Sequence, residues 1–543
     1  MSPMAGWVAD TELLVLAIGL TLFLAFYLGK YMVHLIRGTP RPFEGTLSKV
    51  EGFVFGLAGI DPKRSMDWKE YVIALVLLDA VFAVFTYVVL GLQGTLPGDP
   101  RGLAPFSWDL NFNTTSSFIT NTNLQHYLGD QSLTVTSELV LMLNQFVAPA
   151  SAIAVGLAFI RPFVQKGKGL GNFYADFVRS ILTILLPIAF VTALLLMALG
   201  VPQTLNGTLT TGLIGEGRQT FVVGPLAGFD SIMELGQNGG GYYGANMASP
   251  LANPNGITNL AYLTLMLIIP LAFIFAYGEL VGRGRGRALM VAVLAPFLVL
   301  LVYSLSTPSG PTGLETRFGG FGSVLFQFVS ISTDTGATNA VLSGLSPRTG
   351  ASLFTFMFVQ AIPGGSGVGF MTLVIYAFLT LFMVGLMVGK TPEYLGMKIS
   401  GWDVKLAVLT FVIHPLMILV PAAIAYSSGN VTAILGAHSG AAGFTQVFYE
   451  YTSASANNGS DYLGAAANTP FWNVSTAVVM LVGRFAPIVF MMAIAGSFAT
   501  KDRRDTPEPI KTDGWPFTLT LIGVTFVLTA LAFLPFLILG IFG

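Results

Sequence analysis

The chain has 543 residues, of which 53 % are hydrophobic and only 10 % charged, and its mean hydropathy is +0.73. About a quarter of the residues of a soluble enzyme are charged, so this composition excludes that class and indicates an integral membrane protein. The net charge of -1 comes without a basic block for nucleic acid. The absence of cysteine excludes disulfides, thiolate nucleophiles and cysteine-bound metal centres.

Ten windows are long and apolar enough to cross a bilayer, which takes about 20 residues per helix. They lie at 12–34, 71–93, 136–160, 180–200, 258–282, 288–306, 351–389, 404–427, 472–498 and 516–540. The sequence therefore predicts an all-α integral membrane protein with about ten transmembrane helices in one membrane domain, 1–543. The first window has no basic region before it and no small-residue cleavage site after it, which indicates a retained helix rather than a signal peptide.

Basic residues are distributed unevenly between the predicted loops. Alternate loops, starting after the first window, carry 21 of the 26 Lys and Arg residues, and the opposite loops carry only Arg101, Arg218, Arg317 and Arg348. The remaining one, Arg484, lies within a window. Because the cytoplasmic side carries the excess of basic residues, both termini are predicted to face outside.

The outside segments after the second, fourth, sixth and eighth windows repeat one pattern. Each has a moderately apolar stretch of about 12 residues, too short to span the bilayer, followed by Gly, Asn, Ser and Thr. We interpret each as a re-entrant half-helix with a pore loop, which gives four helix–pore loop–helix repeats around a pseudo-fourfold pore, plus one extra helix at each end. The repeats are placed at 71–179, 180–287, 288–403 and 404–514, between a first helix with a cytoplasmic loop at 12–70 and a last helix at 515–543.

Glycine-rich backbone after a half-helix is typical of a site where carbonyl oxygens replace the hydration shell of a cation. The helix C-termini add partial negative charge, glycine supplies positive φ, and Asn, Ser and Thr can hold the turns. One such segment could be an ordinary polar loop, but four at matching positions favour an ion selectivity filter. Gln125 could accept the ion or hold its loop. The candidate filter residues are Thr120, Asn121, Thr122, Asn123, Gln125, Gln237, Asn238, Gly239, Gly240, Asp334, Thr335, Gly336, Asn457, Asn458 and Gly459.

Two further features are candidates for a gate or barrier. Arg484 could repel cations below the filter or simply bind a backbone carbonyl. The seventh window is interrupted by Gly364, Gly365, Gly367 and Gly369, which we interpret as a gating loop beneath the filter, with a flexible kink as the alternative. Asp79 could bind an ion, although a helix–helix hydrogen bond is the commoner role of a lone intramembrane acid.

The filter segments resemble those of the potassium-binding A subunit of Kdp-type potassium-transporting P-type ATPases. Thr120 to Gln125, Asn238 to Asn246, Asp334 to Ala337 and Ala456 to Ser460 match the four filter motifs of that family, and further matches cover nearly the whole chain. These are Gly389 to Gly396, Pro470 to Asn473 and Gly483 to Phe485. The fourfold plan is also that of the distantly related Trk, Ktr and HKT potassium transporters.

Two residues depart from the family pattern. Leu124 stands where the family often has Trp, which we interpret as a packing change. Asp334 stands where the family more often has a small polar residue. Its carboxylate either faces the pore, which would raise cation affinity, or turns away to hydrogen-bond backbone, which is the interpretation we favour.

The resemblance implies that K⁺ is the transported ion, selected from outside and passed sideways to the ATP-hydrolysing P-type B subunit. It also implies a C subunit and a small single-span F subunit as partners, with membrane lipids as neighbours and a prokaryotic plasma (inner) membrane as the location. No catalytic residue, ATP site or nucleic-acid contact is expected on this chain. The main alternative is a self-sufficient Trk- or HKT-like channel or symporter. An intramembrane enzyme is disfavoured because the charges within the windows are few and scattered.

Overall fold

The computed structural model describes residues 3–42, 44–165, 169–212, 217–307, 314–436, 440–503 and 510–534. Within them the chain is helical with two small hairpins, and ten helices are long and apolar enough to cross a membrane. The predicted all-α membrane fold is thus confirmed. The basic positions 166, 168 and 504 and the last part of the tenth window, 535–540, lie outside the described residues.

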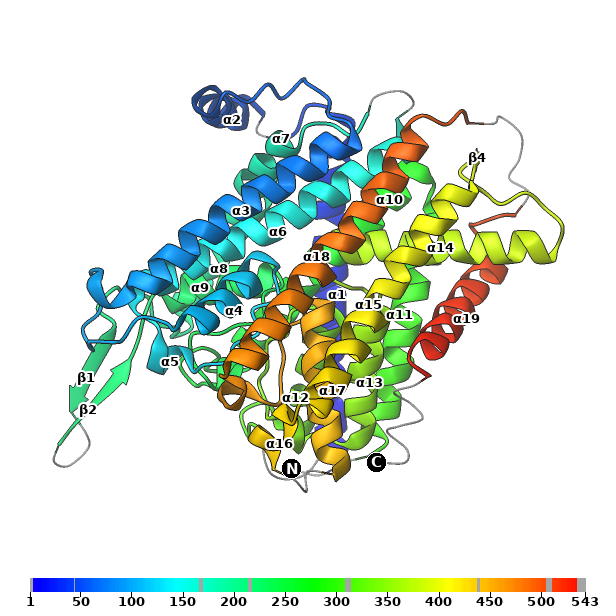
Figure 1. Cartoon of the computed structure of the whole chain (residues 1–543). Helices are drawn as coiled ribbons and strands as arrows, with labels where there is room; N and C mark the ends of the chain where they lie inside the picture. The colour runs from blue at the N-terminus through cyan, green and yellow to red at the C-terminus, as the bar shows by residue number, and fades with distance from the viewer. Residues whose placement is uncertain are drawn as a thin grey trace.

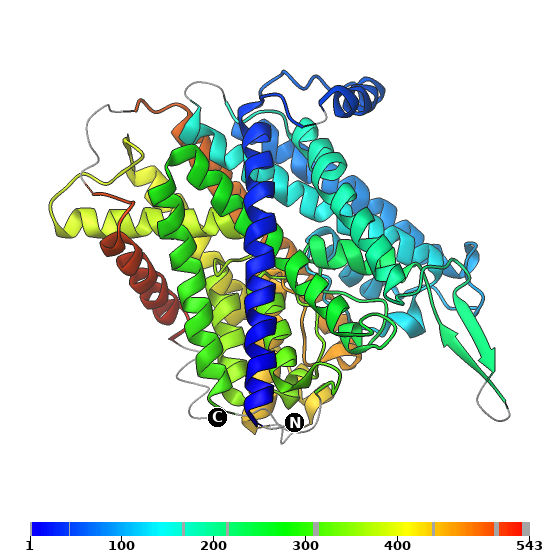
Figure 2. The ribbon, with the colours of Figure 1, turned by 180° about the vertical axis from the view of Figure 1, so that it is seen from behind.

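The long helices follow the predicted windows (Figure 1). They are α1 (Pro3–Arg37), α3 (Trp68–Leu92), α6 (Val135–Val164), α7 (Phe173–Arg179) continued through the π-helical Ser180–Leu185 into α8 (Leu186–Ala198), α10 (Gly256–Val281), α11 (Arg283–Leu305), α14 (Val368–Met387), α15 (Gly401–Ser427), α18 (Pro470–Ala499) and α19 (Trp515–Ala532). α1 runs from the end of the molecule where α16 lies to the end where α2 lies (Figures 1 and 2).

Shorter helices connect these. Four of them are buried along most of their length: α4 (Trp108–Ile119), α9 (Leu226–Leu235), α12 (Gly319–Ser332) and α17 (Gly440–Ala456). We call them the pore helices. The others are α2 (Glu44–Ala58), α5 (Gly129–Ser132), α13 (Pro347–Val359) and α16 (Asn430–Leu435), and 3₁₀ turns lie at Gln93–Thr95, Asn246–Ala248, Leu342–Gly344 and Gly464–Ala467.

Two antiparallel hairpins complete the described chain. β1 (Thr208–Gly212) pairs with β2 (Arg218–Val222), with Thr208 opposite Val222, and β3 (Glu393–Tyr394) pairs with β4 (Met397–Lys398). The first hairpin is not predicted by the hydropathy pattern, and its residues are mostly exposed. A strand with little burial shows no apolar alternation by which it could be recognised.

The seventh window is two helices rather than one long span. α13 ends at Val359, and α14 begins at Val368 after an irregular segment. α14 runs across the direction of α1, nearly horizontal in both views (Figures 1 and 2). The hydropathy of the sequence predicts the length of this apolar stretch. It does not predict that the second helix, α14, runs in a different direction from the other long helices.

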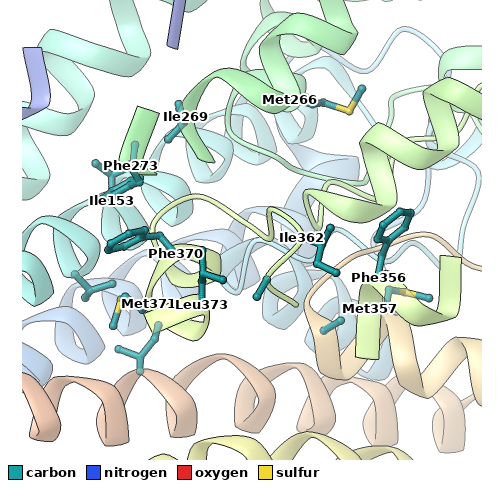
Figure 3. Close-up of a cluster of buried hydrophobic side chains, with 14 of the residues drawn as sticks. Ile153, Met266, Ile269, Phe273, Phe356, Met357, Ile362, Phe370, Met371 and Leu373 are labelled. Carbon is teal, nitrogen blue, oxygen red and sulfur yellow. The ribbon is translucent and has the colours of Figure 1, made fainter. Parts of the chain in front are cut away.

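The interior is built on α6 and α10. In their most apolar windows 94 % and 83 % of the residues are buried, against 28 % for α1, α3 and α19, so the former are central and the latter face the surroundings. Figure 3 shows buried side chains of α6, α10, α13 and α14 around the segment between α13 and α14. Phe273 and Phe370 stack there, with ring centroids 5.9 Å apart. The segment is therefore enclosed by packed side chains.

Candidate functional site

All four pore helices end in the same backbone turn. The second residue beyond each helix cap donates its N–H to a carbonyl near the end of the pore helix: Thr122 to Ser117 (2.9 Å), Asn238 to Met233 (2.8 Å), Thr335 to Ser330 (2.8 Å) and Asn458 to Ser453 (2.9 Å). The residue before each donor has a positive φ: Asn121 (65°), Gln237 (59°), Asp334 (53°) and Asn457 (55°). This is the geometry of a Schellman cap, repeated at four equivalent places.

The source of the positive φ differs from the expectation drawn from sequence. Glycine is expected to supply it, but at the first position beyond each cap the left-handed residue is Asn, Gln or Asp. Glycine is left-handed only two positions later, at Gly336 (79°) and Gly459 (101°), whereas Gly239 is not. Short amide and carboxylate side chains tolerate this conformation because they can hydrogen-bond locally.

The four loops converge at Gly239. A Cβ placed on Gly239 would lie 2.8 Å from the carbonyl oxygens of Asn458 and Thr335 and 2.9 Å from that of Thr122. These oxygens belong to the other three loops, at the positions that donate the capping hydrogen bond. Backbone carbonyls from three loops thus surround one point beside Gly239 in the remaining loop. A side chain at residue 239 would have no room there.

Side-chain amides join neighbouring loops. Asn121 Nδ2 donates to the carbonyls of Gly236 (3.0 Å) and Gln237 (2.7 Å), and Asn457 Nδ2 donates to Thr122 Oγ1 (2.9 Å). Asn458 Nδ2 donates to the Ile331 carbonyl on α12 (3.2 Å). These hydrogen bonds hold the loops against one another. None of them uses the backbone carbonyls of Thr122, Thr335 or Asn458.

The first loop continues into a buried, tightly packed turn. Leu124 is fully buried, and a Cβ on Gly240 would lie 3.0 Å from both the Asn123 carbonyl oxygen and the Gln125 Cδ. Gln125 Nε2 donates to the Tyr127 hydroxyl (3.0 Å), so this amide holds its own loop while its oxygen remains an available acceptor.

His126 links this turn to the fourth repeat, a role that sequence reasoning missed. Its Nε2 lies 2.9 Å from Glu450 Oε1 on α17, and its Nδ1 lies 2.7 Å from Asn473 Oδ1 on α18. Asn473 uses its Nδ2 to donate to Asp109 (2.8 Å), so its oxygen must accept from His126. Burial lowers the pKa of His126, but the hydrogen bond and charge of Glu450 outweigh it and raise the pKa above the ordinary value.

The predicted gating loop lies against two of the filter loops. The N–H of Gly365 donates to Asp334 Oδ2 (3.0 Å), and the N–H and Oγ of Ser366 donate to Gln237 Oε1 (2.5 and 2.6 Å). Gly367 has φ of 74°, and a Cβ on it would lie 2.3 Å from the Ala152 carbonyl oxygen. The segment is thus fixed by specific hydrogen bonds rather than left as a free kink.

Asp334 makes the backbone contact that was one of the two alternatives for it, and a pore-facing role stays a prediction. Its Oδ2 accepts from backbone, which is the interpretation favoured from sequence. Its Oδ1 has no hydrogen-bond partner among the described residues, although it is buried. The residue lines a cavity beneath the loops.

That cavity lies between the filter loops and the helices that follow the gating loop. Its water-accessible volume is ≈ 60 Å³, room for roughly four water molecules. Near the filter it is lined by Asn121, Asp334, Asn457, Gln360, Gly365 and Arg484, and it extends along α14 and α15 past Thr372, Ile375, Leu379, Thr410 and Phe411. The cavity is therefore bordered by the loops on one side and by α14, α15 and α18 on the other.

Arg484 makes the carbonyl contact that was one of the two alternatives for it, and its role as a barrier stays a prediction. Its Nη2 donates to the Ala148 carbonyl (3.1 Å), while its side chain lines the cavity. The carboxylates of Asp79 and Asp334 both attract its charge. Asp79 itself accepts a hydrogen bond from Ser151 on α6 (3.0 Å), which is the helix–helix contact expected of it.

The fold defines a class of membrane transport protein with re-entrant pore helices. It is similar to that of the potassium transporter TrkH from Vibrio parahaemolyticus, with a TM-score of 0.52, 19 % sequence identity, and coverage of 89 % of this chain and 98 % of that one. At this identity the likeness concerns the fold alone.

The sequence identifies the family. The family described as potassium-transporting ATPase A subunit matches residues 15–543, and the chain belongs to it. The resemblance noted from the motifs is confirmed. The protein is a multi-pass membrane protein and a subunit of a potassium transporter, with K⁺ as its transported ion.

Proposed function

We propose that this chain selects extracellular K⁺ in a filter formed by the four loops and passes it to an ATP-hydrolysing P-type partner. The observation that carries the proposal is the convergence of the Thr122, Thr335 and Asn458 carbonyl oxygens on Gly239. Carbonyl oxygens in this arrangement can replace the hydration shell of K⁺. The C-termini of four pore helices add partial negative charge on the cavity side of the loops.

The sideways route is supported by the groups beneath the filter. The gating loop is hydrogen-bonded to the second and third filter loops, and Arg484 adds a positive charge to the cavity wall. Both oppose direct passage of a cation to the cytoplasm, whereas the cavity continues between α14 and α15. The B, C and F subunits as partners, the prokaryotic inner membrane and the outside position of both termini belong to this proposal.

The test is rubidium uptake by cells that lack other K⁺ uptake systems. The chain is expressed alone and together with the ATPase subunits encoded beside it. We expect uptake only with the partners and none after ATP depletion. Uptake by the chain alone would establish instead a self-sufficient channel or symporter and overturn the sideways route.

A further inference from the structure

The four left-handed residues that follow the pore helices carry oxygen-bearing side chains, and the side chain of one of them is fully used in hydrogen bonds within the protein. Gln237 donates through Nε2 to the Met266 carbonyl (2.6 Å), and its Oε1 accepts both hydrogen bonds of Ser366. The other three, Asn121, Asp334 and Asn457, line the cavity.

The amide donors of these side chains are used within the protein, whereas two of their oxygens are buried without a partner among the described residues. The amide nitrogens of Asn121 and Asn457 donate to protein acceptors, among them the Gln237 and Met480 carbonyls. Asn121 is only 6 % exposed, yet its Oδ1 and the Oδ1 of Asp334 have no partner among the described residues. Buried acceptors without a partner cost free energy, and a cation would satisfy them.

A cation would also stabilise the charged form of Asp334. Burial disfavours that form and raises the pKa of the carboxyl group, although the charge of Arg484 acts in the opposite direction. A monovalent cation beside the carboxylate would pair with its charge.

The ligand chemistry favours an alkali cation. One carboxylate and two neutral amide oxygens are hard ligands of low total charge. Within the described residues, no group of three His, Cys, Asp or Glu side chains is placed to hold a metal ion, so a transition metal is not favoured.

We propose that Asn121, Asp334 and Asn457 form a second K⁺ site, made of side-chain oxygens and separate from the ring of backbone carbonyls above it. K⁺ that leaves the filter would be held there before it moves along α14 and α15. The inference rests on the proposed function, because the filter is what delivers K⁺ to this cavity.

The test locates Rb⁺ by its anomalous scattering in crystals of the complex with its partner subunits, for the wild type and for Asp334→Asn. The substitution keeps an oxygen for the Gly365 N–H and removes the charge. We expect two Rb⁺ positions in the wild type and loss of the one beside residue 334 in the variant. The Rb⁺ concentration that half-saturates uptake should rise about tenfold.

Asp130→Asn is the matched control. Asp130 also accepts a backbone hydrogen bond, from the N–H of Gly244 (2.8 Å), but it does not line the cavity. Both Rb⁺ positions and the half-saturating concentration should be retained in this variant.

The outcomes of this experiment distinguish failure of the second K⁺ site from failure of the proposed function. Wild-type Rb⁺ at the carbonyl ring but none beside Asp334 overturns the second site and leaves the filter in place. Rb⁺ beside residue 334 that persists in Asp334→Asn also overturns it. No Rb⁺ at either position, together with no ATP-dependent uptake, overturns both the site and the proposed function.

Discussion

At the scale of single residues, Gly239 is the position in the candidate filter that faces carbonyl oxygens of the three other loops. A methyl group there would lie within 2.9 Å of three carbonyl oxygens, closer than packed atoms tolerate. We predict that Gly239→Ala reduces rubidium uptake by the complex at least tenfold, because the methyl group occupies the space of the ion and displaces its ligands. Gly350→Ala is the control, since nothing lies within 4 Å of its added Cβ. Normal uptake by Gly239→Ala would remove this residue from the ion path.

Arg484 is tested by removing its charge while keeping a hydrogen-bond donor. Arg484→Gln can still reach toward the Ala148 carbonyl but no longer repels a cation in the cavity. We expect rubidium leakage without ATP to rise severalfold in proteoliposomes, because the electrostatic barrier to direct exit is lost. Arg484→Lys keeps the charge and should leak little. Equal leakage by the two variants would show that packing, rather than charge, closes the path.

Between elements, His126 joins the first filter loop to α17 and α18 through two hydrogen bonds. Since its pKa is raised in the folded protein, its stabilising contribution is full below 6.5, the ordinary value, and is lost as pH rises through the raised pKa. Burial and the charge of Glu450 raise the pKa of neighbouring Asp461 to about 8, which acts in the same direction.

We therefore predict that the Tm of the purified complex falls as pH rises from about 6 to 9. The fall should be shallower in His126→Gln, where the contribution of His126 is absent and that of Asp461 remains. Thermal unfolding across this pH range measures both slopes. Parallel curves for the two proteins would rule out titration of His126 as a source of the dependence.

Two glycines of the gating loop, Gly365 and Gly367, differ in backbone conformation and in the space around them. Gly367 has a positive φ and no room for a Cβ, whereas the nearest heavy atom to a Cβ on Gly365 is 3.6 Å away. Gly367→Ala should destabilise the protein by about 1–3 kcal/mol through strain and displacement of the loop. Gly365→Ala should stay close to wild type. Thermal unfolding and uptake of both variants check this, and equal losses in the two would contradict a strained turn at Gly367.

The elements that sequence could predict are those defined by apolar length. A bilayer demands about 20 apolar residues, so nine of the windows correspond to single long helices, while the seventh is divided between α13 and α14. Shorter apolar stretches marked the pore helices. Sequence could not reveal that α14 turns across the others, because hydropathy reports burial and not direction. Nor could it place Asn121 or Asp334 in the left-handed conformation, which is set by how the pore helix ends. The roles of the filter residues in binding K⁺ stay predictions.

At the scale of the whole molecule, the proposed function separates selection from release. The cavity beneath the loops is lined by Arg484 and by residues of α14 and α15, and the buried α6 and α10 enclose the gating loop. Under the proposed function K⁺ leaves through this cavity, so the chain would need a partner beside it. That need would distinguish a component of a pump from a self-sufficient channel.

A bulky side chain in the cavity tests whether K⁺ leaves the filter by this route. Thr410 lines the cavity on α15, and Val412 lies on the same helix with 45 % of its side chain exposed. We predict that Thr410→Phe lowers the maximal rate of ATP-driven rubidium uptake about tenfold and leaves the half-saturating concentration near wild type, because the filter above is untouched and only the exit is narrowed. Val412→Phe adds the same ring outside the cavity and should transport normally. If Thr410→Phe instead changed the half-saturating concentration at an unaltered maximal rate, the cavity would be part of ion selection rather than the route by which the ion leaves.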